Sequence, residues 1–252
     1  MIKKITSKDV KKSFNPHSEQ LAMFKYVFRP MSFILTPFCY NMGLSPDNIT
    51  NARLLMMPAF FCLFFLDNVF YPAIPCFFIF LMVLDCVDGD LARTQNAASF
   101  YGKFLDGLVD WMLILPLPLV AGISYFLIHN DGLILMLIGI TVSTSSLFFH
   151  AMHARYSFIM VWKKSNSTDA SDNPNSSRFD SKVKHLESLA TSVLVNGTSF
   201  APLLFLLPDG HRWYILTTIV CQLLPDLALA FCTIFKARAN LRCHRISRSA
   251  AV

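Results

Sequence analysis

Residues 69–90 read VFYPAIPCFFIFLMVLDCVDGD, and this stretch decides the fold. Nearly every residue in it is apolar until the acids Asp85, Asp88 and Asp90 follow one another at its end. A helix needs about twenty predominantly apolar residues to cross the hydrocarbon of a bilayer, and this run has that length. The stretch therefore predicts a transmembrane helix that ends in a group of carboxylates.

The composition of the whole chain is typical of a membrane protein. Of its 252 residues, 54% are hydrophobic and only 15% are charged, and the mean hydropathy is +0.47. A soluble domain of this size would need more polar surface to cover its core. The apolar residues also come in long runs rather than at amphipathic spacing. We expect a single all-α membrane domain.

Five further apolar runs lie on either side of residues 69–90, which predicts six transmembrane helices in all. The predicted spans are Pro46–Leu66, Val69–Asp90, Gly102–Ile128, Gly132–Trp162, Ser188–Leu207 and Trp213–Lys236. Ser45 and Pro46 give the first span a helix start, with an N-cap serine before a proline at the first helical position. The preceding Leu21–Leu44 is apolar but interrupted by charges and prolines, which predicts an amphipathic helix in the membrane interface.

Three regions follow from this pattern. Residues 1–44 form an N-terminal cytoplasmic tail and interfacial helix, residues 45–238 form the transmembrane domain, and residues 239–252 form a basic cytoplasmic tail. Residues 1–19 are polar and carry five lysines, so we expect them to be loose. Lys163–His185 is rich in Ser, Asn, Asp and Lys, which is typical of a solvated loop.

The distribution of Lys and Arg predicts the orientation in the membrane. The N-terminal segment has seven, the loop Lys163–His185 has five and the tail after Phe235 has five, whereas the three opposite connections contain only Arg212. By the positive-inside rule, both termini then face the cytoplasm, which suits the cytoplasmic (inner) membrane. The net charge of +6 is concentrated at the ends of apolar runs, which indicates lipid headgroups rather than nucleic acid as partner. The seven cysteines show no paired metal-ligand spacing and no disulfide framework.

Four aspartates converge at the cytoplasmic end of the second and third spans. Asp85 and Asp88 are three residues apart and Asp106 and Asp110 four apart, so each pair shares one face of its helix. The short connection makes the two helices antiparallel neighbours. Four carboxylates at membrane depth repel one another unless cations compensate them, and all-oxygen ligands suit Mg²⁺ or Mn²⁺. Enzymes that transfer phosphoryl groups often hold two metal ions between carboxylates, and four carboxylates are enough for such a site.

The residues between these pairs are suited to a phosphorylated ligand. Gly89 has no side chain next to Asp88, which lets a ligand approach the backbone, and Gly102 fits the same interpretation. Ala92 is small, and Arg93 offers a donor fork for phosphate.

Together these residues spell D-x2-D-G-x2-A-R-x8-G-x3-D-x3-D, with every fixed position filled. In this motif the chain closely resembles the CDP-alcohol phosphotransferase (CDP-alcohol phosphatidyltransferase) family. Outside the motif the resemblance is one of general architecture. It implies an integral membrane transferase of lipid biosynthesis. Such an enzyme moves a phospho-alcohol or phosphatidyl group from a CDP-linked donor, such as CDP-diacylglycerol, to an alcohol acceptor and releases CMP.

The resemblance also implies roles for individual residues. Carried over by position, the metal ligands would be Asp85, Asp88, Asp106 and Asp110, and Asp110 would also be the general base. The nucleotide-binding residues would be Asp88, Gly89, Ala92, Arg93, Gly102 and Thr50. Two Mg²⁺ or Mn²⁺ ions and a homodimer would be expected as well. The family often has Pro-Asn at the start of the first span, where this chain has Pro46-Asp47, and this departure affects the nucleotide contacts expected from that helix.

Other polar residues in the spans have two interpretations each. His150, His153 and Arg155 lie late in the fourth span, level with the carboxylates, and would bind a phosphorylated polar acceptor or form an interfacial belt. Asp226, inside the sixth span, would contact substrate or make a packing hydrogen bond. The polar residues of the fifth span, Asn196, Thr198 and Ser199, are typical of contacts between helices.

The main alternative is a metal-ion or proton-coupled transporter that uses the same acids as its pathway. A transporter predicts acids distributed through the depth of the bilayer, whereas these four gather at one end beside Arg93. A structural ion-pair network is also disfavoured, because four acids face one arginine in the motif. The acceptor alcohol is left open by the sequence.

Overall fold

Helices make up the described part of the chain, which in this computed structural model comprises residues 5–13, 22–66, 70–129, 132–166 and 177–249. The α-helices are α1 (Ser7–Ser13), α2 (Arg29–Asn41), α3 (Pro46–Cys62), α4 (Ala73–Thr94), α5 (Phe100–Ile114), α6 (Leu117–His129), α7 (Leu133–Asn166), α8 (Ser177–Phe200), α9 (Gly210–Thr218) and α10 (Leu224–Ser249). The shorter elements are the π-helical η2 (Phe24–Phe28) and η7 (Ile219–Leu223) and the 3-10 helices η3 (Leu63–Phe65) and η6 (Ala201–Leu206). No strand occurs in the described residues, so the all-α prediction is confirmed there.

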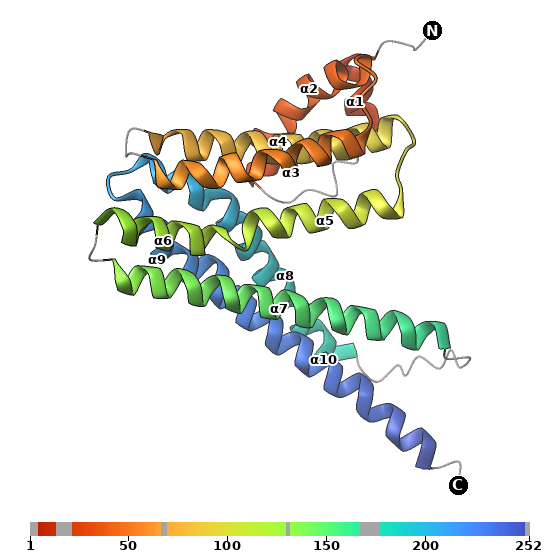
Figure 1. The fold of residues 1–252 in the computed structure, drawn as a ribbon. Helices are drawn as coiled ribbons and strands as arrows, with labels where there is room; N and C mark the ends of the chain where they lie inside the picture. The colour runs from red at the N-terminus through yellow and green to blue at the C-terminus, as the bar shows by residue number, and fades with distance from the viewer. Residues whose placement is uncertain (1–4, 14–21, 67–69, 130–131, 167–176, 250–252) are drawn as a thin grey trace.

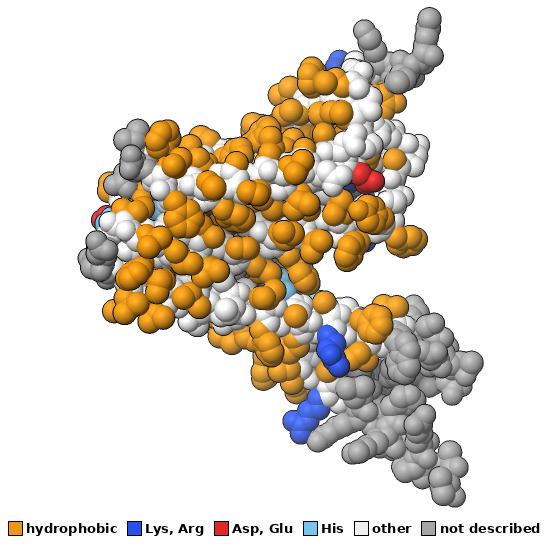
Figure 2. All heavy atoms as spheres, in the orientation of Figure 1, with side chains coloured by type: hydrophobic (Ala, Val, Ile, Leu, Met, Phe, Trp, Pro, Cys, Tyr) orange, Lys and Arg blue, Asp and Glu red, His pale blue; other side chains and the backbone are white. Residues whose placement is uncertain are grey.

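Five segments are long and apolar enough to cross a membrane, which indicates a multi-pass membrane protein. They are Pro46–Phe65, Phe100–His129, Leu133–Val161, His185–Leu206 and Gly210–Arg238. Each coincides with one of the predicted spans. The remaining predicted span, Val69–Asp90, corresponds to α4, whose second half carries three aspartates and Arg93. It stays a prediction. Apolar side chains cover most of the face seen in Figure 2, as expected for a surface that meets lipid.

Prolines accompany three irregularities in the helices, two of them within these long segments. The segment Phe100–His129 is split at Leu115–Pro116 into α5 and α6, because proline has no N–H to donate and its ring clashes with the preceding turn. The two π-helical stretches, η2 and η7, end just before Pro30 and Pro225. A π-bulge is one way to accommodate a proline inside a continuing helix, since it relieves the preceding turn.

The three helices that follow α2 run alongside one another in Figure 1. Helix α3 packs against both α4 and α5. A tight connection joins α4 to α5: Asn96 adopts φ 52° after the last turn of α4, and the Ser99 hydroxyl caps α5 by accepting from Gly102 N–H at 2.9 Å. This connection brings the C-terminal end of α4 and the N-terminal end of α5 to the same side of the bundle.

Helices α6 to α10 form the rest of the bundle. Helix α6 packs closely on α7, where Gly139 lies against the backbone of Pro118 and leaves no room for a side chain. Close approach at glycine is the usual way in which membrane helices pack. Helix α10 packs against α7 and α8, and in Figure 1 α7 extends to the right while α10 extends to the lower right.

Two predicted irregular regions prove partly helical. The predicted loop Lys163–His185 is shorter than expected, because α7 continues to Asn166 and α8 begins at Ser177; residues 167–176 lie outside the described residues. Helix α8 packs on α10, and an ion pair between Lys236 and Glu187 joins the two helices. Parts of the segment whose polar composition predicted a loop thus belong to α7 and α8.

The predicted loose N-terminus is also wrong for residues 7–13, which form α1 and pack against α2. The side chain of Asp9 caps this helix by accepting from both the backbone N–H and the hydroxyl of Thr6. Residues 1–4 and 14–19 of the predicted tail lie outside the described residues. The predicted interfacial segment Leu21–Leu44 is helical over η2 and α2, and α2 exposes Met31, Ile34 and Phe38 on one side.

Candidate active site

The predicted convergence of the carboxylates is confirmed for three of them. One carboxylate oxygen each of Asp85, Asp88 and Asp106 lies within 4.8 Å of the others. Asp88 is almost fully buried, and its carboxylate accepts a hydrogen bond from the Thr50 hydroxyl at 2.9 Å. Asp110 joins the group through a shared partner, Arg53. We call these four acids the carboxylate cluster.

Arg53, from the middle of α3, lies inside the carboxylate cluster and was missed by the sequence analysis. Its side chain is completely buried. Nη1 lies 2.7 Å from Asp85 Oδ1, 3.5 Å from Asp88 Oδ2 and 3.2 Å from Asp106 Oδ1, and Nη2 lies 2.7 Å from Asp110 Oδ1. One guanidinium thus contacts all four acids. Burying charges at this depth is tolerable only because they are paired.

A signal for Arg53 was present in the sequence. It is the only Lys or Arg within the predicted span Pro46–Leu66, and a charged residue inside a membrane helix is a functional candidate by default. Within the motif, Arg93 is the only arginine, and Arg53 lies outside the motif in the preceding span. In the structure Arg93 lies on the outer side of the site, where its Nη2 is 2.6 Å from Asp90 Oδ1.

Two cavities flank the carboxylate cluster and share no lining residue. The larger, which we call the glycine-side cavity, has a volume of about 440 Å³ and lies between α3, α4 and the start of α5. Its lining comprises Pro46, Asp47, Thr50, Asp88, Gly89, Ala92, Arg93, Ala97, Ala98, Ser99, Phe100, Gly102, Lys103 and Asp106. All six residues predicted to contact the nucleotide are among them.

The two motif glycines leave space in this cavity. A Cβ on Gly102 would come within 3.1 Å of Ser99 Oγ and 3.2 Å of Asp47 Oδ1, so a side chain would crowd both. A Cβ on Gly89 would lie 3.6 Å from the nearest guanidinium nitrogen of Arg93, which is ordinary contact. A side chain at Gly102 would therefore make Ser99 and Asp47 shift, whereas Gly89 mainly keeps the cavity open.

The second cavity, which we call the histidine-side cavity, has a volume of about 220 Å³. Its lining comprises Phe24, Phe78, Met82, Asp85, Asp110, Trp111, Ile114, Leu115, His150, Leu194, Val195, Thr198, Ser199 and Gln222. Asp85 and Asp110 thus face one cavity, and Asp88 and Asp106 face the other. The cluster therefore lies between the two cavities and contributes two acids to each.

Of the three residues proposed to bind an acceptor, only His150 lines this cavity. His150 meets the ring of Trp111 at 5.5 Å between centroids, edge to face. The Nδ1 of His153 lies 3.3 Å from the hydroxyl of Thr233 in α10, and Arg155 is exposed. The structure therefore does not gather the three into one group. His153 lies against α10 outside the cavity, and Arg155 is at the surface.

Asp226 lies beside His150 in a buried network between α7 and α10. Its Oδ2 accepts from the hydroxyl of Ser146, whose oxygen accepts from Gln222 Nε2 at 3.0 Å. Its Oδ1 has no hydrogen-bond partner among the described residues and lies 3.9 Å from His150 Nδ1. The packing hydrogen bond, left open by the sequence, is thus present, and the network reaches the cavity through Gln222 and His150.

The three polar residues of α8 that were predicted to contact other helices have different positions: two line the histidine-side cavity, and one contacts the segment before η2. The hydroxyls of Thr198 and Ser199 donate to the backbone carbonyls of Leu194 and Val195, and both residues line the histidine-side cavity. Asn196 instead accepts from the backbone N–H of Ala22, before η2, at 3.3 Å.

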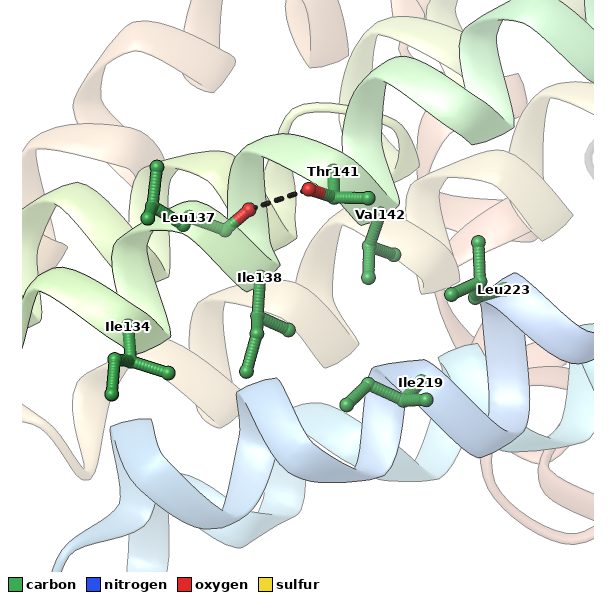
Figure 3. Close-up of a pocket in the computed structure, with 7 residues that line it drawn as sticks. All are labelled: Ile134, Leu137, Ile138, Thr141, Val142, Ile219 and Leu223. Carbon is green, nitrogen blue, oxygen red and sulfur yellow. Dashed lines mark hydrogen bonds between the residues drawn. The ribbon is translucent and has the colours of Figure 1, made fainter.

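A third cavity, of about 260 Å³, lies between α7 and the α9–η7 segment (Figure 3). Its lining is Ile134, Leu137, Ile138, Thr141, Val142, Ile219 and Leu223. Figure 3 shows the hydroxyl of Thr141 directed back to the carbonyl of Leu137, a hydrogen bond of 2.8 Å. The other lining residues are apolar, so this space offers no group for acid–base or phosphoryl chemistry.

The carboxylate cluster fits a divalent cation. Its donors are all carboxylate oxygens from Asp85, Asp88 and Asp106, which hard cations such as Mg²⁺ and Mn²⁺ prefer. The three oxygens lie within 4.8 Å of one another, a grouping that could hold one ion. Arg53 Nη1 lies among the same oxygens, so its guanidinium would have to yield part of this space.

Comparison with known proteins agrees with this geometry. The sequence profile of the CDP-alcohol phosphatidyltransferase family matches residues 43–223. The chain is 37% identical over 84 residues to the CDP-diacylglycerol–glycerol-3-phosphate 3-phosphatidyltransferase of Wigglesworthia glossinidia brevipalpis, which covers 32% of this chain and 44% of the relative. It is 37% identical over 70 residues to the protein of the same name from Pseudomonas fluorescens, covering 27% of this chain and 36% of that protein. The chain thus spans less than half the length of these curated relatives. Because the family profile covers most of it, the chain belongs to the CDP-alcohol phosphatidyltransferase family.

Proposed function

We propose that this protein is a membrane transferase that moves a phospho-alcohol or phosphatidyl group from a CDP-linked donor to an alcohol and releases CMP. The observation that carries the proposal is the position of the carboxylate cluster between two cavities. One cavity is lined by the glycines, alanine and arginine of the family motif, and the other by Asp110. The names of the curated relatives make CDP-diacylglycerol the first donor to test and glycerol 3-phosphate the first acceptor.

The CDP-linked donor would bind in the glycine-side cavity. Gly89 and Ala92 leave the backbone of α4 accessible there, and Arg93 and Lys103 supply positive charge for the diphosphate. Thr50, which donates to Asp88, would keep that carboxylate turned toward the phosphates. The β-phosphate would then lie against the cluster, at the boundary with the other cavity.

Asp85, Asp88 and Asp106 would hold the metal, with Asp110 as a further ligand or neighbour. Bound Mg²⁺ or Mn²⁺, with two ions expected, would neutralise the charge that develops on the phosphates during transfer. Four acids against one buried arginine leave negative charge in the cluster, which supports a need for cations.

The alcohol acceptor would enter the histidine-side cavity, because Asp110 lines it. Asp110 would take the proton of the acceptor hydroxyl, and the hydroxyl oxygen would bond to the β-phosphorus of the donor. The bond from that phosphorus to the bridging oxygen would break, and CMP would leave with the bridging oxygen. Arg53, paired with Asp110 at 2.7 Å, would hold the carboxylate in position. His150 would contact the acceptor in the same cavity.

We further propose that α4 is a sixth transmembrane span and that residues 45–238 form the catalytic domain. Helix α4 has 22 residues, enough to cross the hydrocarbon, and it packs along α3. Helix α2, with its exposed apolar side chains, would lie in the interface. The Lys and Arg distribution supports both termini in the cytoplasm and a cytoplasmic-membrane location. A homodimer is expected from the family resemblance.

The proposal is tested by CMP release from CDP-diacylglycerol and other CDP-alcohols with purified protein and a panel of alcohols. We expect release that needs the alcohol, stops with EDTA and returns with Mg²⁺ or Mn²⁺. Asp110→Asn should lower kcat by about 10²–10⁴-fold with CDP binding retained. Asp209→Asn is the matched control, because Asp209 is an exposed aspartate in the connection before α9. Full turnover by Asp110→Asn would refute the assigned mechanism. Cation uptake by proteoliposomes, without nucleotide binding, would favour a transporter.

A further inference from the structure

Asp90 is a buried acid of the motif region with no role in the chemistry above. It directly follows Gly89 at a variable position of the motif, and its side chain is 1% exposed. Its Oδ2 accepts from the hydroxyl of Ser32 at 2.8 Å. Its Oδ1 accepts from Arg29 Nη1 at 3.1 Å and from Arg93 Nη2 at 2.6 Å. One carboxylate therefore joins two guanidiniums and a hydroxyl.

The bond to Arg93 fixes one wall of the glycine-side cavity. Arg93 is partly exposed there, and its guanidinium lies over Gly89, where a Cβ would be 3.6 Å from it. A long side chain that is anchored in this way loses less conformational freedom when a ligand binds, so anchoring favours affinity. The hydrogen bond to Asp90 holds the arginine against α4, over Gly89.

The other two bonds reach α2, which precedes the residues matched by the family profile. Arg29 also donates to the backbone carbonyl of Cys86 at 3.4 Å, one turn before Asp90. Ser32 is completely buried at this contact. Helix α2 is therefore docked on α4 through the same carboxylate that anchors Arg93.

We propose that Asp90 is a positioning residue for the diphosphate of the donor: it anchors Arg93 and makes nucleotide binding depend on the docking of α2. The ligand class is a nucleoside diphosphate, and the inference rests on the proposed function. Asp90 acts through Arg93 and does not itself contact the ligand, since it is buried and is not among the residues that line the glycine-side cavity.

The test is the affinity of the full-length protein for CDP alone, measured by titration calorimetry in detergent with Mg²⁺. This measurement needs neither acceptor nor turnover. We expect Asp90→Asn and Arg93→Gln each to weaken CDP binding about tenfold. In the double variant the two effects should not multiply, because Asp90 acts through Arg93. In turnover assays Asp90→Asn should raise the donor KM and leave kcat within about twofold. Ile34→Ala, a change at an exposed residue of α2, should leave CDP affinity unchanged.

Two results would overturn the inference while the proposed function stands: wild-type CDP affinity in Asp90→Asn, or effects of the two substitutions that multiply in the double variant. If Asp90→Asn does not fold, Ser32→Ala and Arg29→Gln test the same bridge from the side of α2. Both should then bind CDP about threefold more weakly, and wild-type affinity in both would refute the inference. A wild-type protein that binds no CDP would instead refute the proposed function.

Discussion

Arg53 and Asp110 form an ion pair across 57 positions of the sequence, with Nη2 of the arginine donating to Oδ1 of the aspartate at 2.7 Å. The other terminal nitrogen of Arg53 contacts Asp85, Asp88 and Asp106. A single buried side chain of α3 thus links acids on α4 and α5. It is the nearest positive charge to the carboxylate that we assign as the general base.

Replacement of Arg53 should destabilise the metal-free protein. Arg53→Gln leaves buried carboxylates without a counter-charge, and removing one partner of a buried ion pair typically costs about 3–5 kcal/mol. Divalent cations should compensate, so Mg²⁺ should raise the melting temperature of Arg53→Gln more than that of the wild type. Thermal unfolding in detergent with Mg²⁺ or EDTA measures both effects. Arg155→Gln, an exposed change in α7, is the control, and an equal Mg²⁺ effect in all three proteins would contradict this role.

A side chain at Gly102 should impair donor binding. In Gly102→Ala the new Cβ crowds Ser99 Oγ and Asp47 Oδ1, and both residues line the glycine-side cavity. We expect the donor KM to rise about threefold to tenfold, or roughly 0.7–1.4 kcal/mol. In Gly107→Ala, on the same helix, the Cβ meets nothing within 4 Å, so the donor KM should not change. Equal donor KM values in the two variants would show that the glycine-side cavity is not the donor site.

In the late part of α7, substitution of a residue that lines the histidine-side cavity should change the acceptor KM, and substitution of a surface residue should not. His150→Ala should raise the acceptor KM, because His150 lines the histidine-side cavity with Asp110. Arg155→Ala should leave it unchanged, because Arg155 is exposed. Steady-state kinetics with the acceptor identified in the CMP-release assay decide the matter. A larger effect at Arg155 than at His150 would instead favour an acceptor site at the surface.

The close packing of α6 on α7 should be sensitive to a single methyl group. In Gly139→Ala the Cβ would overlap the carbonyl oxygen of Pro118, and backbone cannot move aside as a flexible side chain can. Overpacking of this kind typically costs about 1–3 kcal/mol. Chemical denaturation in detergent should show the loss, with Gly107→Ala as a control that is neutral or slightly stabilising. A wild-type midpoint for Gly139→Ala would show that α6 and α7 pack less closely.

The sequence alone predicted the helical class and the meeting of Asp85, Asp88 and Asp106. Both depend on local rules: the length of an apolar run sets a span, and helical periodicity with a short connection brings nearby acids together. The start of α8 at Ser177 was not predictable in this way, because the polar composition of that segment is typical of a solvated loop.

Tertiary structure alone decided which charges pair and how the cluster is divided. Arg53 enters the cluster because α3 packs against α4 and α5, and no spacing within the motif determines that packing. Arg93 and Asp90 are three residues apart on α4, so helical spacing allows their ion pair, whereas Arg29 and Ser32 reach Asp90 only because α2 packs on α4. The packing of these helices also sends Asp88 and Asp106 to one cavity and Asp85 and Asp110 to the other. The motif residues are encoded locally, whereas their partners come from helices whose approach is set by the whole bundle.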